Sequence, residues 1–194
     1  AQRQLPEAVF RELYYAEPSD DGGNPFGQEA IRKCIGDISG KPPVVYGVDL
    51  AKSVDWTVAI GLDDEGAVCR FDRYQWPWEE TVRRLTQEVG LVPAVVDSTG
   101  VGDPIVERLQ RSLSNVQGYH FSSSSKQKLM EGLAVAIQTN EVRYPQGPIV
   151  AELDLFAFEY TRTGVRYSAP DGAYDDCVMA LALAVYGRTG APGV

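Results

Sequence analysis

The apolar positions in the first part of the chain fall into short runs separated by polar turns. The first run, VVYGVD at residues 44–49, is rich in β-branched residues, and similar runs occupy residues 57–62 and 68–75. The turn-forming segment DDEG lies between the last two runs. Runs of this length and composition are typical of neighbouring antiparallel strands. We therefore predict a three-stranded antiparallel meander over residues 44–75.

After residue 75 the pattern alternates between helical and strand periodicity. Pro77 is followed by Glu79 and Glu80, a combination that favours the first turn of a helix. Near the end, Thr163-Gly164 lies at the centre of a short strand-forming segment and predicts a hairpin. In chain order we predict a helix over 78–89, a strand over 94–97, a helix over 104–113, a strand over 116–121, a linker over 122–125, a helix over 126–139, a hairpin over 159–167 and a last helix from Asp175.

Length and composition fit one domain with a short extension. A chain of 194 residues with 44% hydrophobic content can bury one core but not two full domains. We predict that residues 44–194 form this domain and that residues 1–43 form an N-terminal linker packed on it. The linker is expected to contain a helix around residues 5–15 and to end in Pro42-Pro43, a stiff entry to the first strand. No signal peptide or membrane-length apolar run is present, so we expect a soluble intracellular protein.

Acidic residues stand at three places where the elements end or begin. Asp49 and Asp97 close two predicted strands, and Asp175-Asp176 open the apolar helix DDCVMALALAVYG. Carboxylates carried on two strand ends and a helix start can converge on one point, where their hard oxygen atoms suit Mg²⁺ or Mn²⁺. The sequence therefore predicts a divalent-metal site.

Each acid also has a simpler structural role open to it. Asp97 precedes Ser-Thr-Gly and could form a turn, and Asp175 or Asp176 could cap the last helix. Asp49 is harder to explain in this way, because a carboxylate within an apolar strand costs several kcal/mol unless it is paired or bound to a cation. The order of elements between the three places favours a shared site over three separate roles.

The order of strands, helices and acids resembles the ribonuclease H fold. The segments GVDLAKSVDWTVAIGLDDEG, VVDSTGVGDPIVERL and YDDCVMALALA are similar to the nuclease domain of the large terminase subunit of tailed bacteriophages. The segment LPEAVFRELYYAEPSDDGGNPF resembles the part that joins such a nuclease to the ATPase domain of the packaging motor. The resemblance covers nearly the whole chain. It implies a mixed five-stranded sheet, three antiparallel strands followed by parallel strands, flanked by helices and carrying an additional hairpin.

The resemblance also implies a mechanism. Two Mg²⁺ or Mn²⁺ ions would hydrolyse phosphodiester bonds of double-stranded DNA with little sequence specificity. Asp49 would bridge both ions, Asp97 would serve the ion on the leaving-group side, and Asp176 would serve the ion that generates hydroxide. Asp175 would be a further ligand or a cap.

Helpers and partners follow from the same resemblance. Lys52 and Asp55 are expected to support the ligands from a second layer. Expected partners are double-stranded DNA, the terminase ATPase domain, the portal and the small terminase subunit, in the host cytoplasm and transiently on the procapsid.

The net charge of −9 argues against DNA binding by bulk electrostatics, because phosphate contacts need Lys and Arg. Two divalent ions would neutralise about four of these charges. The hairpin carries Arg162 and Arg166 shortly before the acidic helix, and this pair is our candidate for a phosphate contact.

Several other chemistries have weaker support in the sequence. GDISGK at residues 36–41 lacks the glycine spacing of a phosphate loop, and the three cysteines have no Cys-x-x-Cys spacing. His120, the only histidine, is expected in the fifth strand with a structural role.

Two alternatives to a nuclease remain. GVDLAKSVDWTVAI is also similar to the first phosphate loop of actin-like and sugar-kinase-like phosphotransferases, although those enzymes clamp ATP between two repeats and this chain has room for one. A catalytically inactive DNA-binding or docking module is the other alternative.

Overall fold

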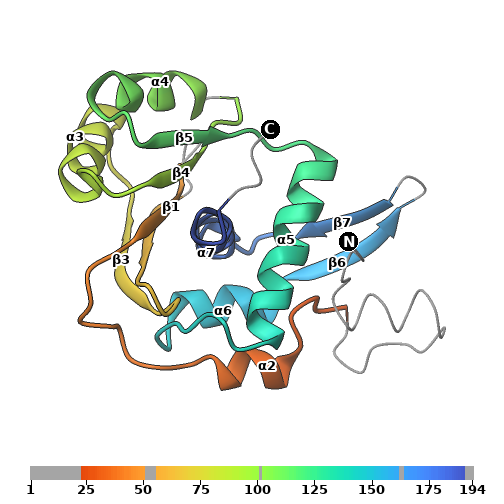
Figure 1. Cartoon of the computed structure of the whole chain (residues 1–194). Helices are drawn as coiled ribbons and strands as arrows, with labels where there is room; N and C mark the ends of the chain where they lie inside the picture. Colours follow the sequence, from red (N-terminus) through yellow and green to blue (C-terminus); the bar gives the residue numbers. More distant parts are fainter. Residues whose placement is uncertain (1–22, 51–55, 101, 162–163, 191–194) are drawn as a thin grey trace.

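A five-stranded mixed sheet forms the centre of the molecule (Figure 1). The computed structural model describes residues 23–50, 56–100, 102–161 and 164–190. The sheet order is β3-β2-β1-β4-β5, in which β1 pairs antiparallel with β2 and parallel with β4. The strands are β1 (Val45–Asp49), β2 (Thr57–Leu62), β3 (Val68–Tyr74), β4 (Ala94–Asp97) and β5 (Val116–Tyr119). This confirms the predicted meander and the parallel strands that follow it.

Helices cover both faces of the sheet, and a separate hairpin projects from one side (Figure 1). One face is covered by α3 (Trp78–Val89) and α4 (Gly102–Ser112). The other face is covered by α7 (Asp176–Arg188), which packs in turn against α5 (Ser123–Gln138). Two short helices, α2 (Gln28–Lys33) and α6 (Pro148–Leu155), complete this layer. The hairpin consists of β6 (Ala157–Thr161) and β7 (Gly164–Ser168), as predicted.

The alternation of side chains in β1 and β4 decides which face the acids share. Val45 and Val95 belong to the core beneath α7, whereas Tyr46 belongs to the core beneath α3 and α4. Successive residues of a strand point to opposite faces, so positions two apart share a face. Asp49 and Asp97 therefore lie on the α7 face of the sheet.

Two glycines let α7 lie unusually close to the sheet. A Cβ atom on Gly47 of β1 would be 2.1 Å from the backbone oxygen of Ala180 in α7. A Cβ atom on Gly187 of α7 would be 2.6 Å from a methyl carbon of Val45. Only a residue without a side chain fits at these two contacts. The distance between α7 and β1 therefore depends on both glycines.

The predicted linker over residues 122–125 is wrong. Ser122 is the N-cap of α5, and its hydroxyl oxygen accepts a hydrogen bond from the amide of Ser125. The Ser125 hydroxyl oxygen accepts in turn from the amide of Ser122 at 2.8 Å. This reciprocal arrangement is a capping box, in which serine takes the place more often held by Glu or Gln. A run of serines that suggests a solvated linker thus begins a helix.

Two described helices, α2 and α6, were not predicted as helices. The segment between residues 139 and 159 contains α6, which begins with Pro148 at its first position directly after Gly147. Proline is favoured at this position because its missing N–H needs no partner in the first helical turn. The helix is short and mostly apolar, so it has little amphipathic periodicity to reveal it.

Part of the N-terminal extension contacts the rest of the molecule. The Asn24 amide donates to the Leu153 carbonyl oxygen at 2.8 Å, and the Phe26 ring lies 5.6 Å from that of Phe156. The boundary at residue 43 remains a prediction, and the helix expected near residues 5–15 lies outside the described residues.

The cysteines and the histidine have no catalytic setting in the fold. Cys34, Cys69 and Cys177 are buried and free, as expected for core thiols. His120 lies just beyond β5 and is exposed, whereas it was expected within the strand. No helix in the described part of the chain is long and apolar enough to cross a membrane.

Candidate metal centre

The four predicted metal ligands line one pocket. Its volume is about 160 Å³, and it lies where the carboxyl ends of β1 and β4 meet the start of α7. Four carboxylates contribute to its wall: Asp49, Asp97, Asp175 and Asp176. The remaining lining residues are Leu50, Phe121, Lys126, Ala173, Tyr174 and Met179. The fold thus brings together carboxylates from three separate parts of the sequence.

Strand pairing places the first two carboxylates side by side. β1 and β4 are parallel neighbours with Val48 opposite Val96, so the next residues, Asp49 and Asp97, end the two strands at the same level. The exposed fractions of these two aspartates are 8% and 2%. Neighbouring strands lie about 4.8 Å apart, which brings both carboxylates within reach of a shared ligand.

Asp97 also fulfils the turn-forming role considered for it. Its Oδ1 accepts a hydrogen bond of 2.7 Å from the amide of Thr99. The Thr99 hydroxyl oxygen accepts in turn from the amide of Phe121, another residue of the pocket wall. The turn therefore fixes the orientation of the Asp97 carboxylate, so that the two roles are compatible.

Asp175 and Asp176 occupy the first positions of α7. Asp175 is the N-cap residue by position, but its side chain makes no capping hydrogen bond. Its Oδ2 instead lies 3.3 Å from the Lys126 ammonium of α5. Asp176 is the first helical residue and is only 7% exposed. Asp175 therefore faces the pocket rather than the helix amides.

The donor chemistry of the pocket fits a hard divalent cation. Carboxylate oxygens are the ligands that Mg²⁺ and Mn²⁺ prefer. No three Asp, Glu, His or Cys side chains among the described residues are already close enough together to hold an ion. Binding would therefore require the carboxylates of Asp175 and Asp176 to move closer to those of Asp49 and Asp97, and Lys126 to yield part of its contact with Asp175.

A buried ion pair next to the pocket was not anticipated. Glu152 of α6 is 6% exposed, and its Oε2 accepts a hydrogen bond of 2.6 Å from the amide of Cys177 in α7. Its Oε1 lies 3.3 Å from Nη2 of Arg73 in β3. Burial raises the pKa of Glu152, while the Cys177 amide and Arg73 act in the opposite direction.

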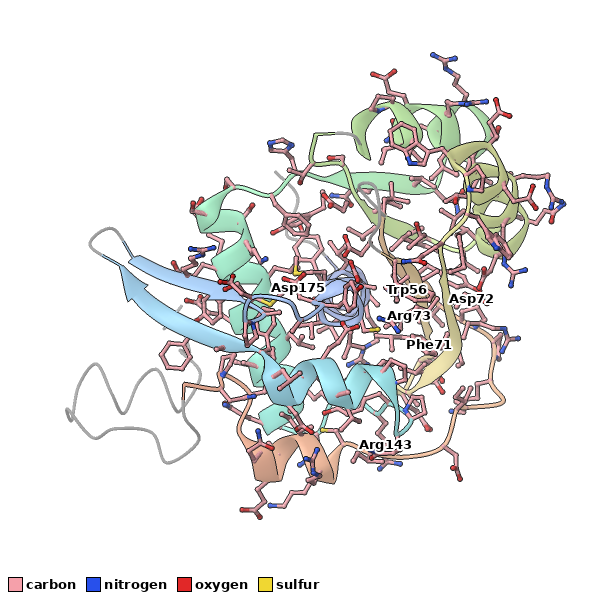
Figure 2. All side chains as sticks on the ribbon, turned by 180° about the vertical axis from the view of Figure 1, so that it is seen from behind. Trp56, Phe71, Asp72, Arg73, Arg143 and Asp175 are labelled. Carbon is pink, nitrogen blue, oxygen red and sulfur yellow. The ribbon has the colours of Figure 1, made fainter. Side chains whose placement is uncertain are left out.

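Aromatic rings hold the Arg73 guanidinium. Its central carbon lies 4.3 Å from the centre of the Trp56 ring and 5.7 Å from that of Tyr174. Arg73 and Trp56 are labelled in Figure 2. Distances of this size are typical of cation–π contacts. Arg73 and Glu152 are far apart in the sequence, and Glu152 lies in a helix that was not predicted. No local pattern could have paired them.

Comparison with known proteins identifies the family. No protein-family model matches the chain. The large terminase subunit of Thermus phage G20c is 30% identical over an alignment of 206 positions, which covers 93% of this chain and 41% of that protein. The crystal structure of the large terminase nuclease from thermophilic phage G20c with bound magnesium is 33% identical, with a TM-score of 0.67 over 77% of this chain and 83% of that chain. The chain belongs to the large terminase nucleases.

A more distant terminase nuclease also shows a likeness of fold. The nuclease domain of the large terminase subunit of bacterial virus Sf6, solved with manganese and beta-thujaplicinol, is 12% identical, with a TM-score of 0.60 over 84% of this chain and 96% of that chain. The likeness agrees with the mixed sheet order and confirms the predicted ribonuclease H-like fold. This terminase nuclease spans about 41% of the length of the curated relatives that it matches.

The structure describes only some of the residues that were predicted to support the ligands or to contact DNA. Lys52, Asp55 and Arg162 lie outside the described residues. Arg166 lies on β7 and is exposed. Its contact with DNA therefore stays a prediction.

Proposed function

We propose that this terminase nuclease is a metal-dependent endonuclease that cuts double-stranded DNA with little sequence specificity during viral DNA packaging. The observation that carries the proposal is the meeting of four carboxylates from β1, β4 and α7 in one pocket. A relative of known structure binds magnesium, and the donor chemistry of this pocket suits the same class of ion.

Three carboxylates would hold two Mg²⁺ or Mn²⁺ ions. Asp49 would bridge them, Asp97 would hold the ion on the leaving-group side, and Asp176 the ion on the water side. Asp175 would add a fourth carboxylate. When bound, such ions activate water and stabilise the departing 3′ oxygen.

The chain itself supplies orientation and charge. The Thr99 amide holds the Asp97 carboxylate in place, and burial limits the movement of Asp49. Lys126 places a positive charge beside Asp175, where a DNA phosphate entering the pocket would be attracted. Lys52 and Asp55 remain candidate supporting residues, and Arg162 with Arg166 remains the candidate DNA contact.

The partners of the complete protein are also part of the proposal. Relatives that contain this domain are large terminase subunits of more than twice its length. We infer that an ATPase domain, the portal and the small terminase subunit are its partners. The expected location is the host cytoplasm and, transiently, the viral procapsid.

A plasmid-cutting assay tests the function. Supercoiled plasmid is incubated with the chain and manganese or magnesium, with and without chelator, and nicked and linear products are measured. We expect cutting only with metal, and none from Asp49→Ala, Asp97→Ala or Asp176→Ala. Asp171→Ala is the matched control, since this exposed aspartate lies in the loop before α7 and not in the pocket wall.

Three results would contradict all or part of the proposal. Cutting at the parental rate by a pure, folded Asp49→Ala variant would remove this residue from the site. Absence of any metal binding by the parent would favour an inactive docking module, and tight ATP binding would favour the phosphotransferase alternative.

A further inference from the structure

The first turn of α7 receives its cap from another helix. α7 has no side-chain cap of its own, although its N-cap residue is an aspartate. The amide of Cys177 instead donates to the carboxylate of Glu152, which lies on α6. A carboxylate at this end is attracted by the partial positive charge of the helix N-terminus. Glu152 therefore fixes the turn that presents Asp175 and Asp176 to the pocket.

Arg73 connects this cap to two segments of chain that lead to the carboxylates. Its guanidinium contacts Glu152, the Tyr174 ring directly before Asp175, and the Trp56 ring directly before β2. β2 pairs with β1 in a register that sets Val58 opposite Asp49. A single side chain thus touches the entry to α7 and the strand next to β1.

The pair is better suited to fixing geometry than to adding stability. The exposed fractions of the side chains are 21% for Arg73 and 8% for Glu152. Buried ion pairs add little net stability because the loss of hydration offsets the attraction. A carboxylate bonded to a backbone amide and a guanidinium between two rings nevertheless restrict where α7 can begin. Neither residue lines the pocket.

We propose that Arg73 and Glu152 are positioning residues that hold the start of α7 at the separation from β1 that metal binding requires. The inference rests on the proposed metal-dependent function. Residues that orient metal ligands from outside the site change metal affinity by about 10–100-fold when they are removed. We expect an effect of this kind without the loss of any ligand.

Manganese affinity, measured by calorimetry, is the decisive quantity because it does not depend on cutting. Glu152→Leu should raise the dissociation constant about tenfold, since it removes both the cap and the ion pair. Glu152→Gln keeps an oxygen that can accept from the Cys177 amide, so we expect a smaller rise of about threefold. Arg73→Met should behave like Glu152→Leu.

A second ion pair on the same helix provides the matched control. Asp154 of α6 binds Arg32 at 2.8 Å, and neither residue lines the pocket or contacts α7 through this pair. Asp154→Leu should leave the manganese dissociation constant unchanged within about twofold, whatever its effect on melting temperature. The comparison separates loss of an ion pair from loss of α7 positioning.

The outcomes distinguish the inference from the function on which it rests. Parental manganese affinity in folded Glu152→Leu and Arg73→Met would overturn the positioning role and leave the nuclease proposal intact. If Glu152→Leu does not fold, Glu152→Gln decides, and an unchanged dissociation constant in that variant overturns the inference. A parent chain that binds no manganese would overturn the proposed function and the inference together.

Discussion

At the scale of single residues, the pocket carboxylates differ in what else they do. Asp97 holds a turn through the Thr99 amide, whereas Asp175 pairs with Lys126. Their separate contacts allow charge and structure to be changed independently. Substitutions that keep shape but remove charge are therefore the most informative.

Asp97→Asn should abolish cutting while preserving the fold. The asparagine oxygen can still accept from the Thr99 amide, but a neutral amide is a poor ligand for a divalent ion. We expect a loss of cutting of at least about 100-fold with a melting temperature close to that of the parent. Asp97→Ala also loses the turn contact. Its free energy of unfolding should fall by about 1 kcal/mol, and its melting temperature should fall accordingly. Equal melting temperatures of the two variants would contradict the turn role.

Asp49→Asn should be more stable than the parent without metal and less stable than the parent with metal. In the described part of the chain, four carboxylates and one Lys line the pocket, so without metal the removal of one negative charge reduces repulsion and should raise the melting temperature. Ions that bind only the folded state stabilise it by about 2.7 kcal/mol at a hundredfold excess over the dissociation constant. The variant should lose most of this gain. Equal shifts in melting temperature on adding manganese would show that Asp49 is not a ligand.

Glu88 should make stability depend on pH at a place remote from the pocket. Burial, together with the neighbouring Asp72 carboxylate, raises the pKa of Glu88 to about 8, although Arg84 lowers it in part. The folded state therefore holds a proton that the unfolded state releases above about pH 4.5. The contribution of this proton to the free energy of unfolding is fully present below pH 4.5 and is lost as the pH rises through about 8.

Glu88→Gln removes this loss. The difference in melting temperature between Glu88→Gln and the parent should increase from pH 5 to pH 9, by a few degrees or about 1–2 kcal/mol. The control is Glu107→Gln on the exposed side of α4. A difference that stays constant across this range would contradict a raised pKa for Glu88.

At the scale of elements, the contact of α7 with β1 controls both stability and the site. Gly47→Ala would place a methyl group 2.1 Å from the Ala180 carbonyl oxygen, so that α7 must move away. We expect a loss of about 3 kcal/mol or more, measured by denaturant unfolding, and weaker manganese binding. Gly132→Ala in α5 is the control, because nothing lies within 4 Å of its new methyl group. It should raise stability by about 0.5–1 kcal/mol, since alanine favours helices.

Some elements could be predicted because their signals are local. The strand ending in Asp97 and the helix beginning at Trp78 were predicted with their observed bounds, because an apolar run and a proline with two glutamates mark them. The start of α5 was misjudged because Ser125 performs a capping role usually taken by Glu or Gln. The contact of Arg73 with Glu152 depends on how the fold places β3 beside α6, which no sequence pattern contains.

At the scale of the whole molecule, acidic residues outnumber basic ones, and part of the positive charge is paired within the fold. The net charge is −9, and some cations are engaged within the fold, as Arg73 is with Glu152 and Arg84 with Asp72. Under the proposed function, DNA is then attracted by bound ions and by exposed basic side chains, of which Arg166 is one.

Replacing Arg162 and Arg166 together with Ala should weaken DNA binding and flatten its salt dependence. Each phosphate contact releases counterions, so the loss of two contacts lowers the slope of log K against log salt by about 2. Binding of a short duplex, measured by fluorescence anisotropy between low and moderate salt, provides the slope. An unchanged slope would remove the hairpin from the DNA interface.

The dependence of the pocket on α7 also sets the stage of protein synthesis at which the proposed cutting activity can first arise. Asp49 and Asp176 are separated by 127 positions of chain, and synthesis proceeds from the N-terminus. A growing polypeptide that already contains β1 has neither the helix that packs against Gly47 nor the carboxylates that α7 contributes. Under the proposed function, incomplete products released from the ribosome would therefore leave the DNA of the host uncut, because the ability to cut arrives only with the completed fold.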